Sequence, residues 1–192
     1  MTAPRIESNL GQIKRNIEVL TRRLGQRGIG VTGVAKAVCG HPGVARAMLD
    51  GGVAALADAH IENGEQLRRD GVRAPICLIR TPMLSQADGI PAICEASYNT
   101  ELDVIHKLAE AALRTDTVHG VILMAEMGDL REGIMPGDLL AAARRVTAIP
   151  GVYLKGIGAN FACLSGTAPD SRALIDLSNL AGAIEATLRA RL

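Results

Sequence analysis

Aromatic residues are scarce in this sequence, making up 2% of its 192 residues, and Trp is absent. With 48% hydrophobic residues, the core must be built from Ala, Val, Ile and Leu, as in many layered α/β proteins. The formal net charge is only +1, and the arginines are scattered through predicted helices. This pattern gives neither a nucleic-acid footprint nor a polybasic membrane anchor, so we expect no nucleic-acid and no membrane partner.

Long apolar runs are missing as well, since none approaches the ~18 residues that span a bilayer. The first ten residues, MTAPRIESNL, lack the apolar stretch of a signal peptide, and we predict a cytoplasmic protein. The four cysteines form no metal-binding spacing and are interpreted as buried thiols in a reducing cytoplasm. They are Cys39, Cys77, Cys94 and Cys163. There is no HExxH motif, so we predict no metal. There is also no P-loop motif and no GxGxxG after the first predicted strand, so nucleotide folds lose their main signature.

What the chain does have is a regular alternation of short apolar runs with helical segments. The runs are nearly continuous in hydrophobicity, which is typical of strands buried on both faces of a parallel sheet. Strands are predicted at residues 30–38, 53–58, 75–80, 92–97, 119–126 and 152–160. Helices are predicted at residues 6–24, 42–49, 60–69, 101–114, 136–147 and 171–192.

This βα repeat predicts an α/β fold with parallel strands and outer helices. Six such units fit either a doubly wound sheet or part of a (β/α)8 TIM-type barrel. A complete barrel takes ~250 residues, so a barrel here is incomplete by about two units. No linker interrupts the chain, and we therefore predict one domain over residues 1–192.

Functional residues of parallel α/β proteins collect at the carboxyl ends of the strands. Here those positions hold Lys36, Asp58, Arg80, Asn99, Glu126 with Arg131, and Asn160. Lys36 stands out because it lies within the apolar segment VTGVAKAVCG, and lysine is rarely buried. Desolvation there would lower its pKa and give a neutral amine able to attack an aldehyde. The alternative is a strand-end lysine whose ammonium extends to solvent.

Lys155 also interrupts an apolar strand and is the competing amine. Four strand residues follow it before Asn160, which places it toward the beginning of that strand. In a barrel that end serves stability, and a structural role is favoured there.

Two later segments carry further polar candidates. In MAEMGDLREGI, two glycines bracket Arg131, whose fork of donors suits a carboxylate or a phenolate oxygen. The alternative is a surface arginine paired with Glu132. In KGIGANFACLSG, Gly156, Gly158 and Asn160 share one face, and the two glycines leave a gap for a flat ring or for a large neighbour. The lone histidines His41 and His60 are interpreted as loop donors.

In this order, VTGVAKAVCGHP, MAEMGDLREG and GIGANFACLSG resemble the signature segments of the alanine racemase-like, fold-type III pyridoxal phosphate enzymes. Within that family, ADAHIENGEQLR and LIRTPMLS are most similar to the ornithine or basic amino-acid racemase branch. The resemblance implies a pyridoxal-phosphate-dependent amino-acid racemase, an isomerase that interconverts L- and D-amino acids, with a homodimer or other self-association.

The resemblance also assigns roles. Lys36 would form the internal aldimine with pyridoxal phosphate and act as one of two bases, and Arg131 would contact the phenolic oxygen of the cofactor. Asn160 would lie beside the pyridine ring, where the family usually has a histidine. Arg80 and Asn99 would line the substrate end of the pocket.

Two departures from the family pattern affect these expectations. The position of the family's phosphate-binding tyrosine is Cys39, which makes alanine a less favoured substrate. The chain also stops before the β-domain that carries the second base, so we expect the 192 residues alone to racemise weakly or not at all. The competing functions are a non-catalytic pyridoxal phosphate carrier and a Schiff-base aldolase that uses Lys155.

Overall fold

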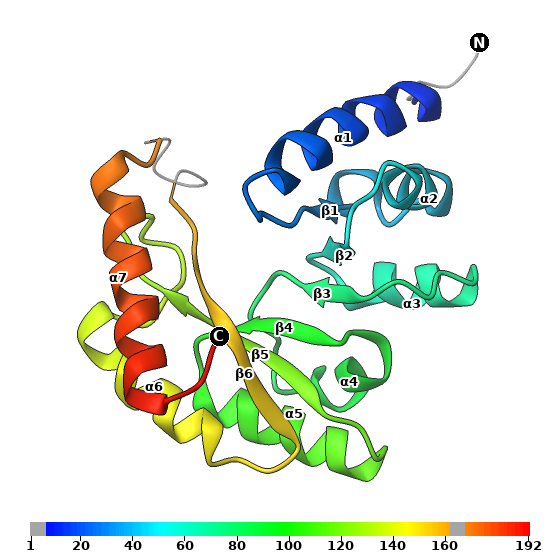
Figure 1. The fold of residues 1–192 in the computed structure, drawn as a ribbon. Coiled ribbons are helices and arrows are strands. Elements are labelled where there is room, and N and C mark those ends of the chain that lie inside the picture. The colour runs from blue at the N-terminus through cyan, green and yellow to red at the C-terminus, as the bar shows by residue number, and fades with distance from the viewer. Residues whose placement is uncertain (1–6, 162–167) are drawn as a thin grey trace. The chain divides into compact units, whose positions relative to one another are not determined.

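A computed structural model describes residues 7–161 and 168–192. Helices and strands alternate along the chain (Figure 1), which confirms the predicted α/β class. The strands are β1 (Thr32–Val34), β2 (Ala55–Asp58), β3 (Ile76–Leu78), β4 (Ala96–Asn99), β5 (His119–Ala125) and β6 (Val152–Ala159). The helices are α1 (Leu10–Gly25), α2 (Pro42–Asp50), α3 (Ile61–Arg69), α4 (Ile90–Ile93), α5 (Leu102–Arg114), α6 (Pro136–Thr147) and α7 (Ser171–Leu188), with short 3-10 turns η1 (Lys36–Val38) and η2 (Ala87–Gly89).

The chain divides into two compact units, Met1–Cys77 and Leu78–Leu192. In the first unit β1 pairs in parallel with β2, with Val34 opposite Ala57. The amide of Leu56 donates to the carbonyl of Pro75 at 2.9 Å, which brings the start of β3 beside β2. Parallel pairing places the carboxyl ends of these strands at one edge, where Lys36 follows β1.

The predicted strand over residues 30–38 is too long. The backbone turns at Ala35, with φ −98° and ψ 0°, and Lys36–Val38 form a 3-10 turn instead. The segment before β4 was also predicted wrongly. Residues 92–93 belong to the short helix α4, which has a proline in its first turn, and the strand starts only at Ala96.

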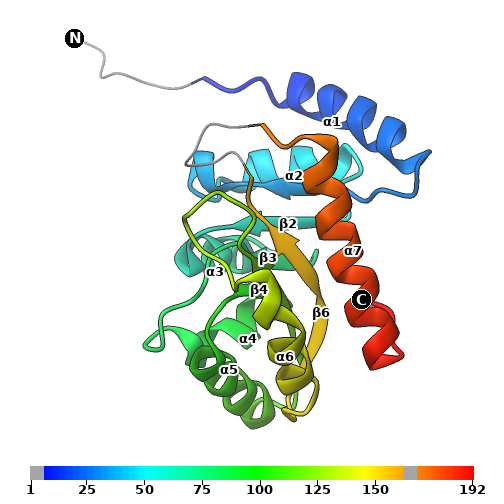
Figure 2. The ribbon, with the colours of Figure 1, turned by 90° about the vertical axis from the view of Figure 1, so that its left-hand side faces the viewer.

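In the second unit β4, β5 and β6 are adjacent and parallel. One face of this sheet is packed against helices, and Figure 2 shows α6 and α7 beside β6. The core there is aliphatic, as the shortage of aromatic residues requires. Its fully buried members include Ile105, Val121, Leu123, Leu139 and Ile184.

The register between β5 and β6 shifts at Val121 and Ile122, which pair with Leu154 and Gly156. Lys155 is the extra residue of this β-bulge and has no partner on β5. Because a bulge changes which face the following residues occupy, Gly156 and Gly158 lie on the face of Ile122 and Met124. That is the face away from the helices.

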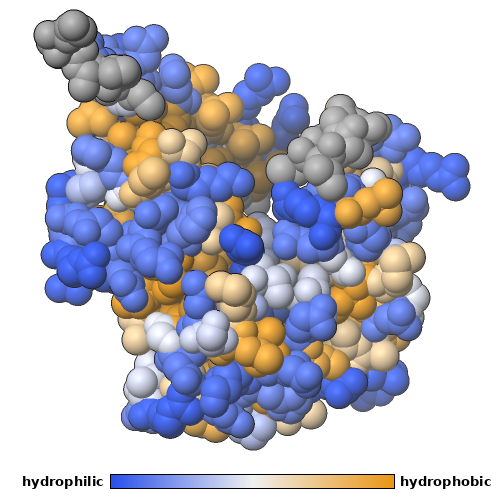
Figure 3. Space-filling view, turned by 180° about the vertical axis from the view of Figure 1, so that it is seen from behind, coloured by the Kyte–Doolittle hydropathy of each residue, from blue (hydrophilic) through white to orange (hydrophobic). Residues whose placement is uncertain are grey.

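The surface in Figure 3 is mostly hydrophilic, with apolar side chains between the polar ones. Within the described ranges, no helix is long and apolar enough to cross a bilayer. The prediction of uniformly buried thiols is wrong: Cys94 is buried and Cys77 half-buried, but Cys39 is exposed. Cys163 lies outside the described residues.

Candidate functional site

Lys36 is the first residue of η1 and lies two residues beyond Val34, the carboxyl end of β1. Its side chain is exposed, so the predicted burial in an apolar strand end is wrong for this chain. The reason is local: β1 is three residues long, and both Thr32 and Val34 are exposed while only Gly33 between them is buried. In the described part of the chain the amine of Lys36 makes no hydrogen bond or ion pair, and it is therefore available to a ligand.

The turn that carries Lys36 is held by its own backbone. Amides of Cys39 and Gly40 donate to the carbonyls of Lys36 and Ala35 at 3.2 and 3.1 Å. Gly40 has φ +64°, and a Cβ there would lie 2.8 Å from the Cβ of Asn63. Glycine is needed at this position because it fits both the left-handed conformation and the close approach to α3.

Asp58, at the end of β2, supports the same turn through its hydrogen bond to Asn63. It is 1% exposed, and its Oδ1 accepts from the His60 amide at 3.0 Å and from Asn63 Nδ2 at 2.9 Å. Asn63 is the residue that Gly40 approaches. Asp58 therefore organises the start of α3 and the floor of the η1 turn, a structural role.

Cys39 and His41 line a cavity of about 430 Å³ in the first unit, together with the start of α1. Cys39 has φ +49° and caps the 3-10 turn. His41 was predicted as a loop donor, but its Nδ1 accepts from the amide of Gly43 at 3.2 Å and caps α2. Both residues thus have a local structural explanation.

The loop after β5 is closed by two backbone hydrogen bonds. The amide of Glu126 donates to Ile134 O at 2.9 Å, and that of Ile134 donates to Met124 O at 2.7 Å. Gly133 adopts φ +156°, and a Cβ there would clash with the backbone of Glu126, including its Cα at 2.6 Å. A side chain at position 133 is incompatible with this closure.

The carboxylate of Glu126 organises the interior of the same loop. Glu126 Oε1 accepts from the amides of Gly128 at 2.6 Å and Leu130 at 3.2 Å. These bonds hold the tight turn in which Gly128 has φ +101° and Leu130 φ +54°. Such charge-assisted bonds to backbone amides are among the stronger hydrogen bonds in proteins.

Arg131 and Asn160 are brought together by Glu132. Glu132 Oε1 accepts from Arg131 Nη2 at 2.9 Å and from Asn160 Nδ2 at 3.1 Å. Arg131 Nε also lies 3.9 Å from Asp129 Oδ2. The Arg131 side chain is 32% exposed and remains within reach of a ligand. The sequence indicated the Arg131–Glu132 pair, but nothing in it indicated that Glu132 also binds Asn160.

Of the two β6 glycines, Gly156 leaves open space on the face away from the helices, whereas Gly158 accommodates the Met124 side chain. A Cβ at Gly156 would meet no atom within 4 Å, and one at Gly158 would meet Met124 Sδ at 3.2 Å. Without side chains at these positions, the strand offers a flat apolar surface that ends at Asn160. Such a surface beside the Arg131 donors can hold a flat ring with an anionic oxygen.

Asn99 differs from the expectation that it lines a substrate pocket. It is buried and in register with Leu123, on the helix-covered face of the sheet. Its Nδ2 donates to the carbonyl and the hydroxyl of Ser97, at 2.9 and 3.0 Å. These contacts give Asn99 a structural role, and a contact with substrate stays a prediction. Arg80, exposed beyond β3, also stays a prediction.

Ser97 continues this buried network to His119. Its Oγ lies 2.8 Å from His119 Nε2, and His119 Nδ1 lies 3.1 Å from the carbonyl of Cys94. A carbonyl only accepts, so Nδ1 donates and Nε2 accepts from Ser97 in the neutral ring. Burial lowers the pKa of His119 to about 4, against the weaker opposing effects of the Cys94 carbonyl and of Glu95. The ring is therefore neutral at pH 7.

Lys155, the competing amine, is the fourth residue of β6 and lies in the bulge. Its Nζ is 5.9 Å from the centre of the Tyr153 ring, a cation–π distance. This position is four residues before the carboxyl end of the strand. Lys155 thus lies away from Asn160, and the structural interpretation fits it better.

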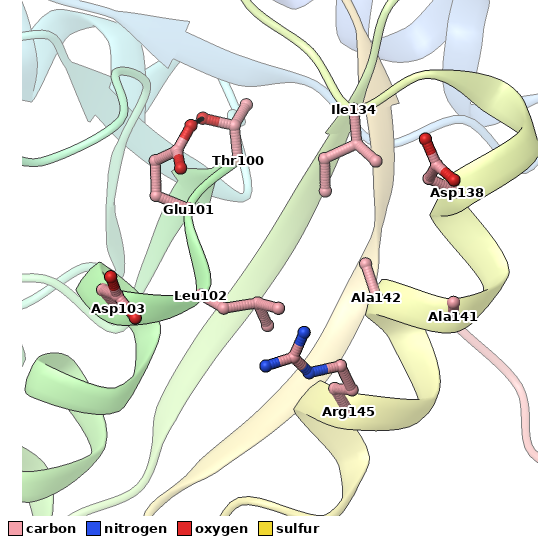
Figure 4. A pocket seen from close by; sticks show the side chains of 9 residues that line it. All are labelled: Thr100, Glu101, Leu102, Asp103, Ile134, Asp138, Ala141, Ala142 and Arg145. Atoms are coloured by element: carbon pink, nitrogen blue, oxygen red, sulfur yellow. Dashed lines mark hydrogen bonds between the residues drawn. The ribbon is translucent and has the colours of Figure 1, made fainter.

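A cavity of about 480 Å³ in the second unit is lined by none of the predicted site residues. It is lined by the first turns of α5 and α6 and by Arg145, which points between the two helices (Figure 4). Asp103 and Asp138 are the acidic residues of those first turns, where their negative charges interact favourably with the helix dipoles. Their interaction with the helix dipoles explains these charges without a ligand.

The fold and these strand-end residues define an α/β protein with candidate site residues at the carboxyl ends of parallel strands in each unit. The model of the alanine racemase N-terminal domain family matches residues 8–191. The chain belongs to that family.

Curated relatives agree with this assignment. The chain is 27% identical over 179 residues to the ornithine racemase of Acetoanaerobium sticklandii, a match covering 93% of this chain and 50% of the relative. It is 29% identical over 169 residues to the lysine racemase of Thermotoga maritima, covering 88% and 47%. The chain spans about half the length of these relatives.

Solved structures share the fold. An alanine racemase from Clostridium difficile 630 matches with a TM-score of 0.73 and 20% identity, over 94% of this chain and 49% of that one. A D-threonine aldolase from Filomicrobium marinum matches with a TM-score of 0.80 and 16% identity, over 98% and 53%. At these identities the likeness concerns the fold alone.

Proposed function

We propose that this chain is the pyridoxal-phosphate-binding part of an amino-acid racemase and that Lys36 is the lysine that bonds covalently to the cofactor. The observation that carries the proposal is an exposed amine, unpartnered among the described residues, just beyond the carboxyl end of β1. Family membership supports the same role, since the matched relatives are racemases.

The residues present fit this cofactor. The side-chain-free face at Gly156 and Gly158 suits a flat pyridine ring, and the Arg131 donors suit its phenolic oxygen. The amine of Lys36 suits its aldehyde. When bound, pyridoxal phosphate supplies an electron-withdrawing ring that stabilises negative charge on the α-carbon of the substrate.

The residues of the chain would then divide the remaining tasks. Lys36 would hold the cofactor through its aldehyde, and its amine would move the α-proton of the substrate as a general base. Arg131 holds anionic oxygens through its fork of donors, and Asn160 bounds the edge of the flat surface. Inversion of the α-carbon needs a base on each face, and Lys36 supplies one of them.

For the substrate we propose a basic amino acid. The support is that two curated relatives, matched over 93% and 88% of this chain, are an ornithine and a lysine racemase. The exchange of substrate α-protons with D2O, followed by NMR, tests this choice because one base suffices for exchange. We expect Lys36-dependent exchange with ornithine or lysine. Exchange with alanine alone would contradict the choice. A homodimer and a cytoplasmic location remain predictions.

The test of the central proposal is borohydride reduction of the protein mixed with pyridoxal phosphate, followed by peptide mapping. The chain has only four lysines, so each adduct can be assigned. We expect the pyridoxyl group on Lys36, its loss in Lys36→Ala, and its retention in the matched control Lys155→Ala. An adduct on Lys155 that survives Lys36→Ala would support the aldolase alternative and overturn this proposal.

A further inference from the structure

We propose that Glu132 is a positioning residue that holds Arg131 and Asn160 together as one preformed binding edge for the cofactor ring. This inference rests on the proposed function for its ligand. The link between Glu132, Arg131 and Asn160 rests on hydrogen bonds within the chain alone.

The geometry is specific because one carboxylate oxygen serves two donors from different elements. Glu132 Oε1 accepts from Arg131 Nη2 at 2.9 Å and from Asn160 Nδ2 at 3.1 Å, and Asn160 is 28 positions away in sequence. The parallel pairing of β5 and β6, which runs as far as Ala125 opposite Ala159, brings the loop and Asn160 to the same edge. Glu132 then joins them.

The hydrogen bond also orients the Asn160 side chain. With Nδ2 directed at the Glu132 carboxylate, the carbonyl end of the amide is turned away from it. Arg131 is restrained on two sides, by Glu132 and by Asp129. A guanidinium held in this way loses less conformational entropy when it binds an anionic oxygen.

This role is separable from the folding of the loop. The loop backbone is closed by the bonds between Glu126, Ile134 and Met124, and its turn is held by the Glu126 carboxylate. Glu132 takes part in none of these bonds. A variant at position 132 should therefore keep the backbone of the loop and alter only its side-chain order.

The experiment compares Glu132→Ala and Glu132→Gln with Glu110→Ala, which removes an exposed glutamate paired with Lys107 on α5. Each protein is titrated with pyridoxal phosphate and with 3-deoxypyridoxal phosphate, which lacks the phenolic oxygen. We expect Glu132→Ala to raise the apparent Kd for pyridoxal phosphate about tenfold, with a smaller loss for Glu132→Gln, which keeps an acceptor. For the deoxy analogue all variants should stay within about twofold of the unsubstituted chain.

Coupling to Arg131 sharpens the test. In an Arg131→Ala background, Glu132→Ala should have a much smaller effect on the Kd for pyridoxal phosphate, because of the two residues that Glu132 positions only Asn160 is left. Equal losses for both ligands, or a full additional loss in the double variant, would overturn the positioning role and leave a structural one.

The NMR signal of the Asn160 side-chain amide, assigned through Asn160→Ser, tests the link without any cofactor. We expect it to shift in Glu132→Ala and to stay in place in Glu110→Ala. An unchanged signal overturns the inference whatever the chain binds. If the signal shifts but the unsubstituted chain forms no adduct on Lys36, the proposed function fails while the Glu132 link stands.

Discussion

In the first unit, Lys36 follows β1 in a turn that main-chain bonds hold, and its exposed amine has no partner among the described residues. In the second unit, Arg131 and Asn160 extend from a closed loop and a strand end and share the carboxylate of Glu132. The contrast corresponds to the two kinds of chemistry proposed. A nucleophile must form and break bonds and needs a free amine, whereas donors that orient a ligand gain from being held in advance.

The largest expected effect comes from adding a side chain at Gly133, where the loop after β5 closes on its own backbone. We expect Gly133→Ala to lower the free energy of unfolding by about 3 kcal/mol, because φ +156° is unfavourable for alanine and its Cβ meets the Glu126 backbone. In the first unit, Gly40→Ala should cost less, about 2 kcal/mol, since the α-left region is open to other residues at modest cost and part of its clash is with a side chain.

Urea denaturation followed by circular dichroism measures both losses. Gly137→Ala is the matched control, since a Cβ there meets nothing within 4 Å and alanine favours the helix by up to ~1 kcal/mol. A loss for Gly40→Ala as large as that for Gly133→Ala would remove the contrast in loop rigidity between the units.

The next effect is a pH dependence confined to the second unit. The pKa of His119 is lowered by burial from 6.5 to about 4, so between these values the unfolded chain binds a proton that the folded chain does not. The stabilising contribution is complete above pH 6.5 and is lost as the pH falls toward 4, by about 3 kcal/mol in total.

To isolate this contribution, urea midpoints are compared at pH 7 and pH 4.5. His119→Asn should lose stability at pH 7 but show a flatter pH dependence than the unsubstituted chain. His106→Gln, which replaces an exposed histidine on α5, should keep the original dependence. Parallel pH profiles for all three proteins would show that protonation of His119 does not limit stability.

Much of this contrast was visible in the sequence. The alternation of apolar runs and helices predicted all six strands, and the strand-end rule selected Lys36, Arg131 and Asn160 as candidates. Strand ends can be read this way because apolar continuity and the turn residues that interrupt it are local properties of the chain.

The features that were missed depend on contacts between distant segments. The bulge at Lys155 is a shift in the pairing of β6 with β5, and no pattern within β6 shows it. The exposure of Lys36 follows from how little of β1 is covered, and apolar neighbours in sequence do not guarantee a covered strand. The second partner of Glu132 is likewise 28 positions away.

A smaller effect separates the roles of Glu126 and Glu132 in the loop after β5. Glu126→Gln should weaken the turn by about 1 kcal/mol, because a neutral acceptor replaces a charged one for the amides of Gly128 and Leu130. Hydrogen exchange of these two amides should then accelerate by about fivefold, while Glu132→Gln leaves their exchange unchanged. Acceleration in both variants would mean that Glu132 also supports the loop backbone.

The smallest effect concerns the first unit, where α1 has no buried residue and few other anchors. Thr21 Oγ1 lies 3.0 Å from the carbonyl of Gly51, a buried residue at the end of α2. Thr21→Val keeps the shape and removes this bond, so we expect a loss of about 1 kcal/mol in the free energy of unfolding. Thr187→Val is the matched control and should cost less, because among the described residues the Thr187 hydroxyl bonds only to the carbonyl of Ala183 in its own helix. Since Thr21 also bonds within its own helix, the difference between the two variants measures the contact between α1 and α2. Equal losses would mean that the packing of α1 onto the first unit does not depend on this hydrogen bond, and that the Lys36 turn is held independently of α1.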